Sequence, residues 1–321
     1  MTVVTSKQQK HEISDPKLIE YARQATSFYD NAKSQNTKRA YITDINNYIA
    51  FCKSMDLEYM PATVETIALY ISYMSADYKV STIKRRLSAV SSYHLERNLS
   101  NPVASEPIKI LLKGLKREKG VAADQKNPLL TNDLAKIIYS MPDTLKATRD
   151  KAILLIGFAG AFRRSELSSL NIEDINFVES GAIINLRRSK TDQQGRGQKK
   201  AISYCSNKDT CPIHALQEWI ESAGISSGAL FVSMDRHNNL KQRITSQSIA
   251  LVIKEYAKLV GYDIKDFSGH SLRSGFATQA SKNGVSDHKI KEHGGWRSSV
   301  YHQYIRSGEL FHNNASAMLG L

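Results

Sequence analysis

The chain has 321 residues, more than one hydrophobic core usually supports, so we expect two domains. It holds 44 Lys and Arg residues against 31 Asp and Glu residues, and the net charge of +13 favours a nucleic acid or an acidic membrane surface as partner. Three cysteines, a polar N-terminus and a longest apolar run at residues 152–162 exclude a disulfide scaffold and a membrane span, and they indicate a soluble intracellular protein.

Hydrophobic periodicity predicts four helices in the N-terminal part of the chain. In the first, Tyr41, Ile45 and Tyr48 fall on one stripe. The four segments are TKRAYITDINNYIAFCKSM (37–55), TVETIALYISYM (63–74), VSTIKRRLSAVSSYH (80–94) and EPIKILLKGLKRE (106–118). We therefore expect a disordered N-terminus at residues 1–15 and a helical domain over residues 16–115.

The charged segment KREKGVAADQKNP (116–128) contains a glycine and ends in a proline, which is typical of a linker between domains. A second domain is expected over residues 129–321, with three short strands at 175–178, 182–188 and 199–204. Its predicted helices lie at 131–140, 147–162, 210–223, 246–260, 271–283, 286–292, 298–305 and 309–319. The predicted fold class is mainly α with a small antiparallel β-sheet (α+β).

No cofactor motif stands out in the sequence. There is no G-x-x-x-x-G-K-[ST] loop, and no helical pattern follows GRGQKK (195–200), so use of a nucleoside triphosphate is not expected. Cys205, Cys211 and His214 could suggest zinc, but a fourth ligand is missing and the spacing fits no common zinc finger. Packing of Cys211 and a capping turn explain these residues better, and we expect neither a metal nor another cofactor.

Two pairs of residues each place an arginine one helical turn from a second polar group. Arg163 and Glu166 lie in GAFRRSELSSL, and His270 and Arg273 lie in GHSLRSGFATQA. Two guanidinium groups suit the oxygens of a phosphodiester, especially when negative charge grows in a transition state. The alternatives are a surface salt bridge for the first pair and a simple helix start for the second.

A lysine and a tyrosine complete this set. Lys190 lies in the Gly-containing loop RRSKTDQQGRGQKK, where nearby arginines would lower its pKa from ~10.4 and let it protonate a departing oxygen. The segment GGWRSSVYHQYIRSG (294–308) holds Tyr301 and Tyr304 beside Trp296. Cations around a phosphate would favour ionisation of a phenol with a pKa of ~10. A solvated lysine and core tyrosines are the alternatives.

The order of these residues resembles the tyrosine recombinase (phage integrase) family. The resemblance rests on Arg163, Lys190, His270-x-x-Arg273 and a tryptophan followed by a tyrosine, and HSLRSGFATQA is its most specific part. The tryptophan after Gly-Gly resembles the Cre recombinase branch. The segments TKRAYITDINNYIAFC and VSTIKRRLSAVSSYH look like the family's SAM-like core-binding domain, so the resemblance covers both domains.

The resemblance implies a role for each residue at the scissile phosphate. Arg163 and Arg273 would clamp the phosphate, and Glu166 would orient the first arginine. His270 would assist proton transfer or bind a nonbridging oxygen. Lys190 would protonate the departing 5′ oxygen.

Two tyrosines compete for the role of nucleophile. Tyr304 is followed by Ile305 and Arg306, as in the Cre-like pattern, but it lies eight positions after Trp296, one fewer than in that pattern. We therefore expect Tyr304 to be the nucleophile and Tyr301 to be a packing residue. The resemblance also implies that Trp296 packs against the nucleophile and donates its indole N–H toward the phosphate.

Contacts to DNA are expected on two helices. Lys84, Arg85 and Arg86 form a run opposite the apolar stripe of the third helix, which the family lays in a major groove; a solvated charged face is the alternative. Arg243 and Gln247 lie where ITSQSIALVIKEYA begins, and a helix N-terminus can meet phosphates and base edges.

The resemblance implies a site-specific DNA recombinase whose two domains close around duplex DNA. Strand exchange would pass through a 3′ phosphotyrosine and a Holliday junction, without ATP or metal. The expected partners are double-stranded DNA with a specific target site and a homotetramer on paired sites, with a dimer on each site; accessory proteins stay open. The C-terminal segment 309–321 would dock on a neighbouring subunit or on its own core.

Three other functions stay open on the sequence. A telomere resolvase or a type IB topoisomerase-like enzyme would share the chemistry. A noncatalytic DNA-binding protein would share the fold. A phosphodiesterase of free nucleotides is disfavoured by the basic N-terminal helices.

A recombinase would be cytoplasmic and associated with the nucleoid.

Overall fold

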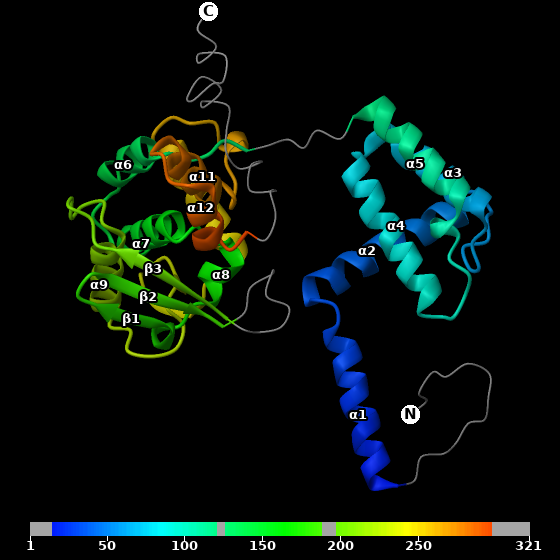
Figure 1. Cartoon of the computed structure of the whole chain (residues 1–321), viewed down its shortest axis with the longest axis horizontal. Coiled ribbons are helices and arrows are strands. Elements are labelled where there is room, and N and C mark those ends of the chain that lie inside the picture. The colour runs from blue at the N-terminus through cyan, green and yellow to red at the C-terminus, as the bar shows by residue number, and fades with distance from the viewer. Residues whose placement is uncertain (1–14, 121–125, 188–196, 297–321) are drawn as a thin grey trace, which may run out of the picture. The chain divides into compact units, whose positions relative to one another are not determined.

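A computed structural model describes residues 15–120, 126–187 and 197–296. The chain divides into two compact units, residues 1–124 and 125–321, each of which has its own hydrophobic core (Figure 1). The described residues form helices and two small antiparallel sheets, which confirms the predicted fold class.

All regular secondary structure in the described part of the first unit is helical. Its α-helices are α1 (Pro16–Asn31), α2 (Gln35–Ser54), α3 (Val64–Asp77), α4 (Val80–Leu95) and α5 (Glu106–Lys119). Helices α2 to α5 confirm the four predicted helices, and their apolar stripes meet in one core. Tyr48 and Tyr70 lie at its centre, with ring centroids 5.1 Å apart and the rings edge to face.

One helix and one helix boundary in this unit differ from the prediction. Helix α1 was not predicted, because its large apolar residues Leu18, Tyr21 and Phe28 are exposed and do not form a buried stripe. Helix α5 continues to Lys119, so the first residues of the predicted linker are helical. The N-terminal residues 1–14, expected to be disordered, lie outside the described residues.

The second unit surrounds a buried helix with other helices and two sheets. The α-helices are α6 (Thr131–Tyr139), α7 (Leu145–Ala159), α8 (Arg164–Ser169), α9 (Pro212–Ala223), α10 (Ser246–Leu259), α11 (Ser271–Lys282) and α12 (Asp287–Gly294). One sheet has the order β1 (Ile175–Val178), β2 (Gly181–Leu186), β3 (Gln198–Ser203), and the other pairs β4 (Val232–Met234) with β5 (Leu240–Arg243). The hairpin of β4 and β5 was not predicted.

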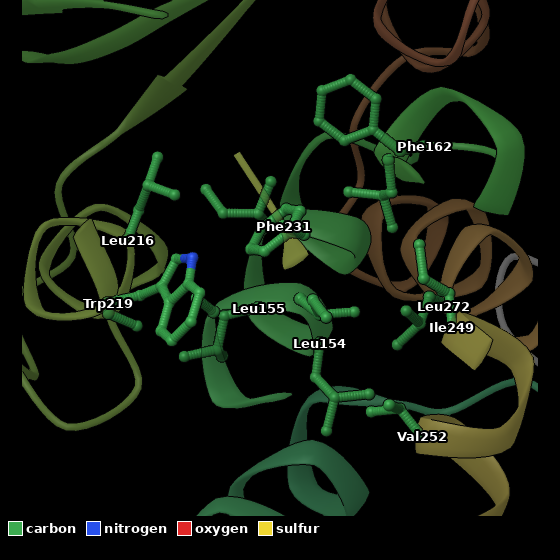
Figure 2. Close-up of a cluster of buried hydrophobic side chains, with 14 of the residues drawn as sticks. Leu154, Leu155, Phe162, Leu216, Trp219, Phe231, Ile249, Val252 and Leu272 are labelled. Atoms are coloured by element: carbon green, nitrogen blue, oxygen red, sulfur yellow. The ribbon is translucent and has the colours of Figure 1, made fainter. Parts of the chain in front are cut away.

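Helix α7 is the centre of the second unit. Leu154 and Leu155 lie in the same buried cluster as Trp219 of α9 and Leu272 of α11, as Figure 2 shows. The indole of Trp219 donates to the carbonyl of Leu230 at 2.9 Å, so its one polar group is satisfied in the core. The apolar run that was too short to span a bilayer is therefore a buried core helix, as predicted. Among the described residues, no helix is long and apolar enough to cross a membrane.

The end of α7 lies earlier than predicted. The helix stops at Ala159, whereas the sequence pattern predicted helix up to residue 162. Ala161 adopts the left-handed conformation with a φ of 48°, and Phe162 donates its N–H to the carbonyl of Gly157. Together with the bond from Ala161 N–H to the Phe158 carbonyl, this is a Schellman motif. It turns the chain sharply, and Phe162 returns to the core.

A buried carboxylate stabilises the first unit. Asp44 of α2 is 1% exposed, and Arg85 Nη1 lies 2.5 Å from its carboxylate. Arg86 is also buried, with its Nε 3.7 Å from the same carboxylate and its guanidinium 4.0 Å from the centre of the Tyr78 ring. The prediction that Arg86 lies on the exposed face of α4 is therefore wrong. It lies at the edge of the buried stripe, where Asp44 offsets its charge.

Replacing this carboxylate should destabilise the first unit. Asp44→Ala leaves the buried Arg86 without a counter-charge, and we expect the free energy of unfolding to fall by about 3 kcal/mol. Urea unfolding followed by circular dichroism measures this loss. Asp77→Ala, at the exposed end of α3, is the control and should change the value by less than about 0.5 kcal/mol. Equal effects would contradict the proposed role of Asp44.

Candidate active site

The turn that ends α7 exposes three successive backbone carbonyls to three side chains. Ala159 accepts from Nε2 of His293 at 2.7 Å, and Gly160 accepts from Nζ of Lys200 at 2.8 Å. Ala161 accepts from Nη1 of Arg273. A carbonyl only accepts, so the His293 ring carries its proton on Nε2. The C-terminal end of a helix has a partial negative charge, which favours cationic groups there.

These three side chains come from three different elements. His293 lies on α12, Lys200 on β3 and Arg273 on α11. The bonds to residues 159–161 therefore hold α12, β3 and α11 around the end of α7. Figure 1 shows α11 and α12 beside each other, and residues of the two helices also share a small apolar cluster.

The residues directly after this turn carry the first arginine of the predicted site. Arg163 precedes α8, and Glu166 in the first turn of α8 accepts the backbone N–H of Arg163 at 2.8 Å. The other carboxylate oxygen of Glu166 bonds Nη1 of the same arginine at 2.5 Å. The side chain of Glu166 is 4% exposed and that of Arg163 is 16% exposed. The carboxylate thus fixes both the backbone and the guanidinium of Arg163.

The second arginine lies under the tryptophan. Arg273 is 1% exposed, and its guanidinium carbon lies 3.9 Å from the centre of the Trp296 ring. The two glycines before the tryptophan allow this contact. A Cβ on Gly294 would come within 1.6 Å of the indole, and Gly295 ends α12 with a φ of 67°. The Gly-Gly-Trp sequence therefore has a geometric reason.

Lys200 is a buried cation close to both arginines. It is 1% exposed, its Nζ donates to the Gly160 and His293 carbonyls, and it lies 5.2 Å from the centre of the Phe162 ring. Burial, as the largest cause, and the charge of Arg273 together lower its pKa to about 7, while Glu166 opposes the shift. Arg163 also lowers this pKa. Lys200, Arg163, Glu166 and Arg273 thus form one electrostatic group.

The imidazole of His293 is neutral and belongs to the same electrostatic group. Burial lowers its pKa, and the nearby cations Lys200 and Arg273 act in the same direction, while the bond to the Ala159 carbonyl opposes them. The imidazole is stacked on Phe276, with ring centroids 4.8 Å apart. His293 is therefore a packing and hydrogen-bonding residue rather than an exposed base.

His270 lies at the start of α11 and is exposed. Its carbonyl accepts the N–H of Ser274, which closes the first turn of the helix. The adjacent Gly269 packs closely on Arg164, because a Cβ there would lie 2.8 Å from Cδ of that arginine. The turn that carries His270 therefore lies against the residue that follows Arg163.

Some of the predicted site residues share one neighbour. Arg163, Glu166 and Arg273 all act on the charge of Lys200, and the Trp296 ring stacks on Arg273. Lys190, Tyr301, Tyr304, Ile305 and Arg306 lie outside the described residues.

Lys200 and His293 were missed by the sequence reasoning. One signal existed for Lys200. In the predicted strand it lies two positions before Ile202, so both side chains project from the same face, toward the core.

The residues predicted to contact DNA differ in their surroundings. Lys84 is exposed, and the neighbouring Lys116 lowers its pKa. Gln247 is exposed in the first turn of α10. Arg243 instead donates to the carbonyls of Ser168 at 3.1 Å and Leu170 at 2.8 Å, at the end of α8. Its side chain therefore already has a structural role.

The cysteines and His214 do not assemble into a metal site. The Cys205 N–H lies 3.3 Å from Sγ of the buried Cys211, and the ring of His214 stacks on Tyr204 with centroids 5.1 Å apart. Among residues 15–120, 126–187 and 197–296, no three His, Cys, Asp or Glu side chains are grouped so that they could hold a metal ion.

Comparison with known families and proteins gives consistent matches. The model described as "Phage integrase family" matches residues 128–308, and "Phage integrase, N-terminal SAM-like domain" matches residues 28–96. An "Integrase/recombinase xerD homolog" from Selenomonas ruminantium is 35% identical over 292 residues, covering 89% of this chain and 86% of the relative. "Recombinase cre" from Escherichia phage P1 is more distant, at 24% identity over 298 residues, covering 86% and 85%.

A solved structure shares the fold. The crystal structure of a lambda integrase tetramer bound to a Holliday junction matches with a TM-score of 0.57 and 16% identity, and the match covers 92% of this chain and 78% of that chain. The likeness extends over both units of the chain.

The buried lysine should make stability depend on pH. The pKa of Lys200 is about 7 in the folded chain, against ~10.4 when unfolded, so the unfolded chain binds more protons between these values. The free energy of unfolding should therefore rise from pH 7 to pH 10, by up to about 4 kcal/mol from this residue.

Thermal or urea unfolding of Lys200→Met at several pH values measures this contribution. Because other groups also titrate in this range, the comparison is with Lys199→Met, which changes the exposed neighbour on the same strand. Lys199→Met should keep the rise with pH, and Lys200→Met should lose part of it. Identical pH profiles for the two variants would contradict a displaced pKa at Lys200.

Proposed function

The chain belongs to the phage integrase family and is a site-specific tyrosine recombinase, and we propose that it cleaves and rejoins DNA through a 3′-phosphotyrosine intermediate on Tyr304. The observation that carries this proposal is the electrostatic group around the end of α7. Arg163, Arg273 and Lys200 are cationic or partly cationic, and among the described residues Glu166 is the one acidic residue that acts on Lys200. An excess of positive charge in a partly buried site favours an anion.

The two arginines would bind the nonbridging oxygens of the scissile phosphate. A guanidinium presents N–H groups in a fixed plane that suits phosphate oxygens. Glu166 holds Arg163 in one orientation, and Trp296 and the Ala161 carbonyl hold Arg273. Both donors are therefore fixed before the substrate binds, so little reorganisation is needed as charge grows on the phosphate.

In the proposed step, the phenolic oxygen of Tyr304 forms a bond to phosphorus, and the bond from phosphorus to the 5′ oxygen breaks. Lys190 gives a proton to the departing 5′ oxygen, and His270 assists the removal of the phenol proton. The 5′ hydroxyl of a partner strand then reverses the step. The covalent link conserves the energy of the broken bond, so the reaction calls for neither ATP nor a metal ion.

The proposed partner is double-stranded DNA with a specific target site, bound by a dimer on each of two sites. The tetramer and the Holliday junction in the solved lambda integrase structure support this assembly. Lys84, Arg85 and Gln247 are the proposed DNA contacts among the described residues. The segment 309–321 would contact a neighbouring subunit.

A covalent adduct tests the chemistry directly. Random-sequence duplexes are first nicked lightly, so that cleavage a few nucleotides before a nick releases a short strand and traps the protein on the 3′ end. We expect adducts that survive detergent and that yield one recurrent sequence when the attached DNA is recovered. Tyr304→Phe should form none, whereas Tyr301→Phe should retain them. Adducts in Tyr304→Phe, or their loss only in Tyr301→Phe, would overturn the assignment.

Binding should also depend steeply on salt. If six or more phosphates are contacted, affinity for the recovered duplex should fall by roughly 1000-fold or more between 50 and 200 mM salt, because bound cations are released from DNA. Lys84→Ala should reduce the slope of log affinity against log salt by about 0.9 if this lysine contacts a phosphate. Fluorescence anisotropy measures both slopes, and a shallow slope for the unchanged protein would contradict an extended DNA interface.

A further inference from the structure

Lys200 contributes charge to the proposed site but makes no bond and transfers no proton in the step proposed above, and it lies where the elements that carry the site meet. We propose that Lys200 is a positioning residue, which fastens β3 and the end of α12 to the end of α7 so that Arg273 and Trp296 keep their places at the phosphate. This inference rests on the proposed function, because it assigns Lys200 a part in the same reaction.

The contacts of Lys200 join segments that are distant in sequence. Its Nζ donates to the carbonyls of Gly160, at the end of α7, and of His293, in the last turn of α12. The two acceptors belong to residues more than 130 positions apart along the chain.

A second side chain of the same strand reaches the same helix end. Gln198 donates from Nε2 to the carbonyl of Glu292 at 3.1 Å. Its amide also lies beside Gly295, where a Cβ would come within 2.6 Å of Oε1 of the glutamine. Gln198 and Lys200 lie two residues apart in β3, so both side chains project from one face of the strand. Strand β3 is therefore attached to α12 at two successive carbonyls.

The end of α12 in turn determines where Trp296 lies. The N–H of Trp296 donates to the carbonyl of Lys291 at 2.9 Å, and its indole stacks on Arg273. Moving His293 and its neighbours would move the indole with them. The Lys200 contacts thus act on the arginine indirectly, through the last turn of α12 and Trp296.

A lysine is a costly residue for a purely structural contact here. Burial and the two nearby arginines disfavour its charge, as the lowered pKa shows. A methionine of similar length would fill the space without that cost, although it would leave two carbonyls unbonded. A neutral lysine amine still has two N–H groups, enough for both carbonyls. The joint can therefore persist on either side of pH 7.

Bound phosphate would strengthen this arrangement. A negative charge between Arg163 and Arg273 favours the protonated form of Lys200, because opposite charges stabilise each other at short range. The charged groups that act on Lys200 come from α8 and α11, and the neutral His293 faces it from α12. The joint would then be tightest when DNA is in place.

The test separates positioning from binding and from stability. The full chain is compared with Lys200→Met, with Gln198→Ala as a milder change at the same joint, and with Lys199→Met as the exposed control on β3. Three quantities are measured at a temperature where every variant is folded by circular dichroism. They are affinity for the duplex recovered from the trapped adducts, the first-order rate of adduct formation at saturating DNA, and quenching of tryptophan fluorescence by acrylamide.

We expect Lys200→Met to bind DNA within about threefold of the unchanged protein but to form adducts about 100-fold more slowly, because a displacement of about 1 Å at reacting groups has effects of this size. Gln198→Ala should show a smaller loss of rate in the same direction. Lys199→Met should keep the rate of the unchanged protein. An unchanged rate in Lys200→Met, or equal losses of rate and affinity, would overturn the proposal.

Fluorescence tests the geometry without any reaction. The chain has two tryptophans, and Trp219 is 0% exposed, so added quenching reports on Trp296. Lys200→Met should raise the accessible fraction, and Lys199→Met should not. If the unchanged protein forms no adduct with any duplex, the proposed function is lost, and this comparison still decides whether Lys200 positions Trp296. Equal quenching in all variants would then overturn the positioning role as well.

Discussion

The C-terminal end of α7 is the point on which the rest of the site depends. A Schellman motif closes the helix at Ala161, and the carbonyls of residues 159–161 are left to accept from His293, Lys200 and Arg273. Three elements thereby converge on one turn, and Arg163 follows directly after it. The C-terminal end of a helix has a partial negative charge and by itself repels anions. Here it binds cationic side chains, which could in turn bind an anion.

The balance of charge at this turn accounts for its chemistry. A single buried carboxylate, Glu166, is bonded to Arg163 and acts on Lys200, and it does not neutralise the group. Burial disfavours the charge of Lys200 most, and the nearby arginines disfavour it further, so its pKa is lowered. In the proposed reaction, a bound phosphodiester would offset that cost. The concentration of positive charge at this turn would therefore favour a phosphate.

Local signals in the sequence were sufficient for helices α2 to α5 and for the pairing of Arg163 with Glu166. Apolar stripes predicted α2 to α5, and one-turn spacing predicted the bond between Arg163 and Glu166. These local signals did not predict the surroundings of a residue whose partner is distant in the sequence. Arg86 was assigned to an exposed face because Asp44, its counter-charge, lies on another helix. Lys200 was overlooked because its partners come from α7 and α12, and the helix end was misplaced because its left-handed residue is Ala161 rather than a glycine.

We propose that Arg163 and Arg273 together hold the oxygens of one phosphate within reach of the Tyr304 phenol. A crystal structure of the protein with orthovanadate joined between Tyr304 and the 5′ hydroxyl of its target DNA measures this directly, because five-coordinate vanadate mimics the transition state of the proposed step. We expect nitrogen atoms of both guanidinium groups at about 2.9 Å from vanadate oxygens, with Trp296 still stacked on Arg273. Vanadate bound away from either arginine, or linked to Tyr301, would contradict it.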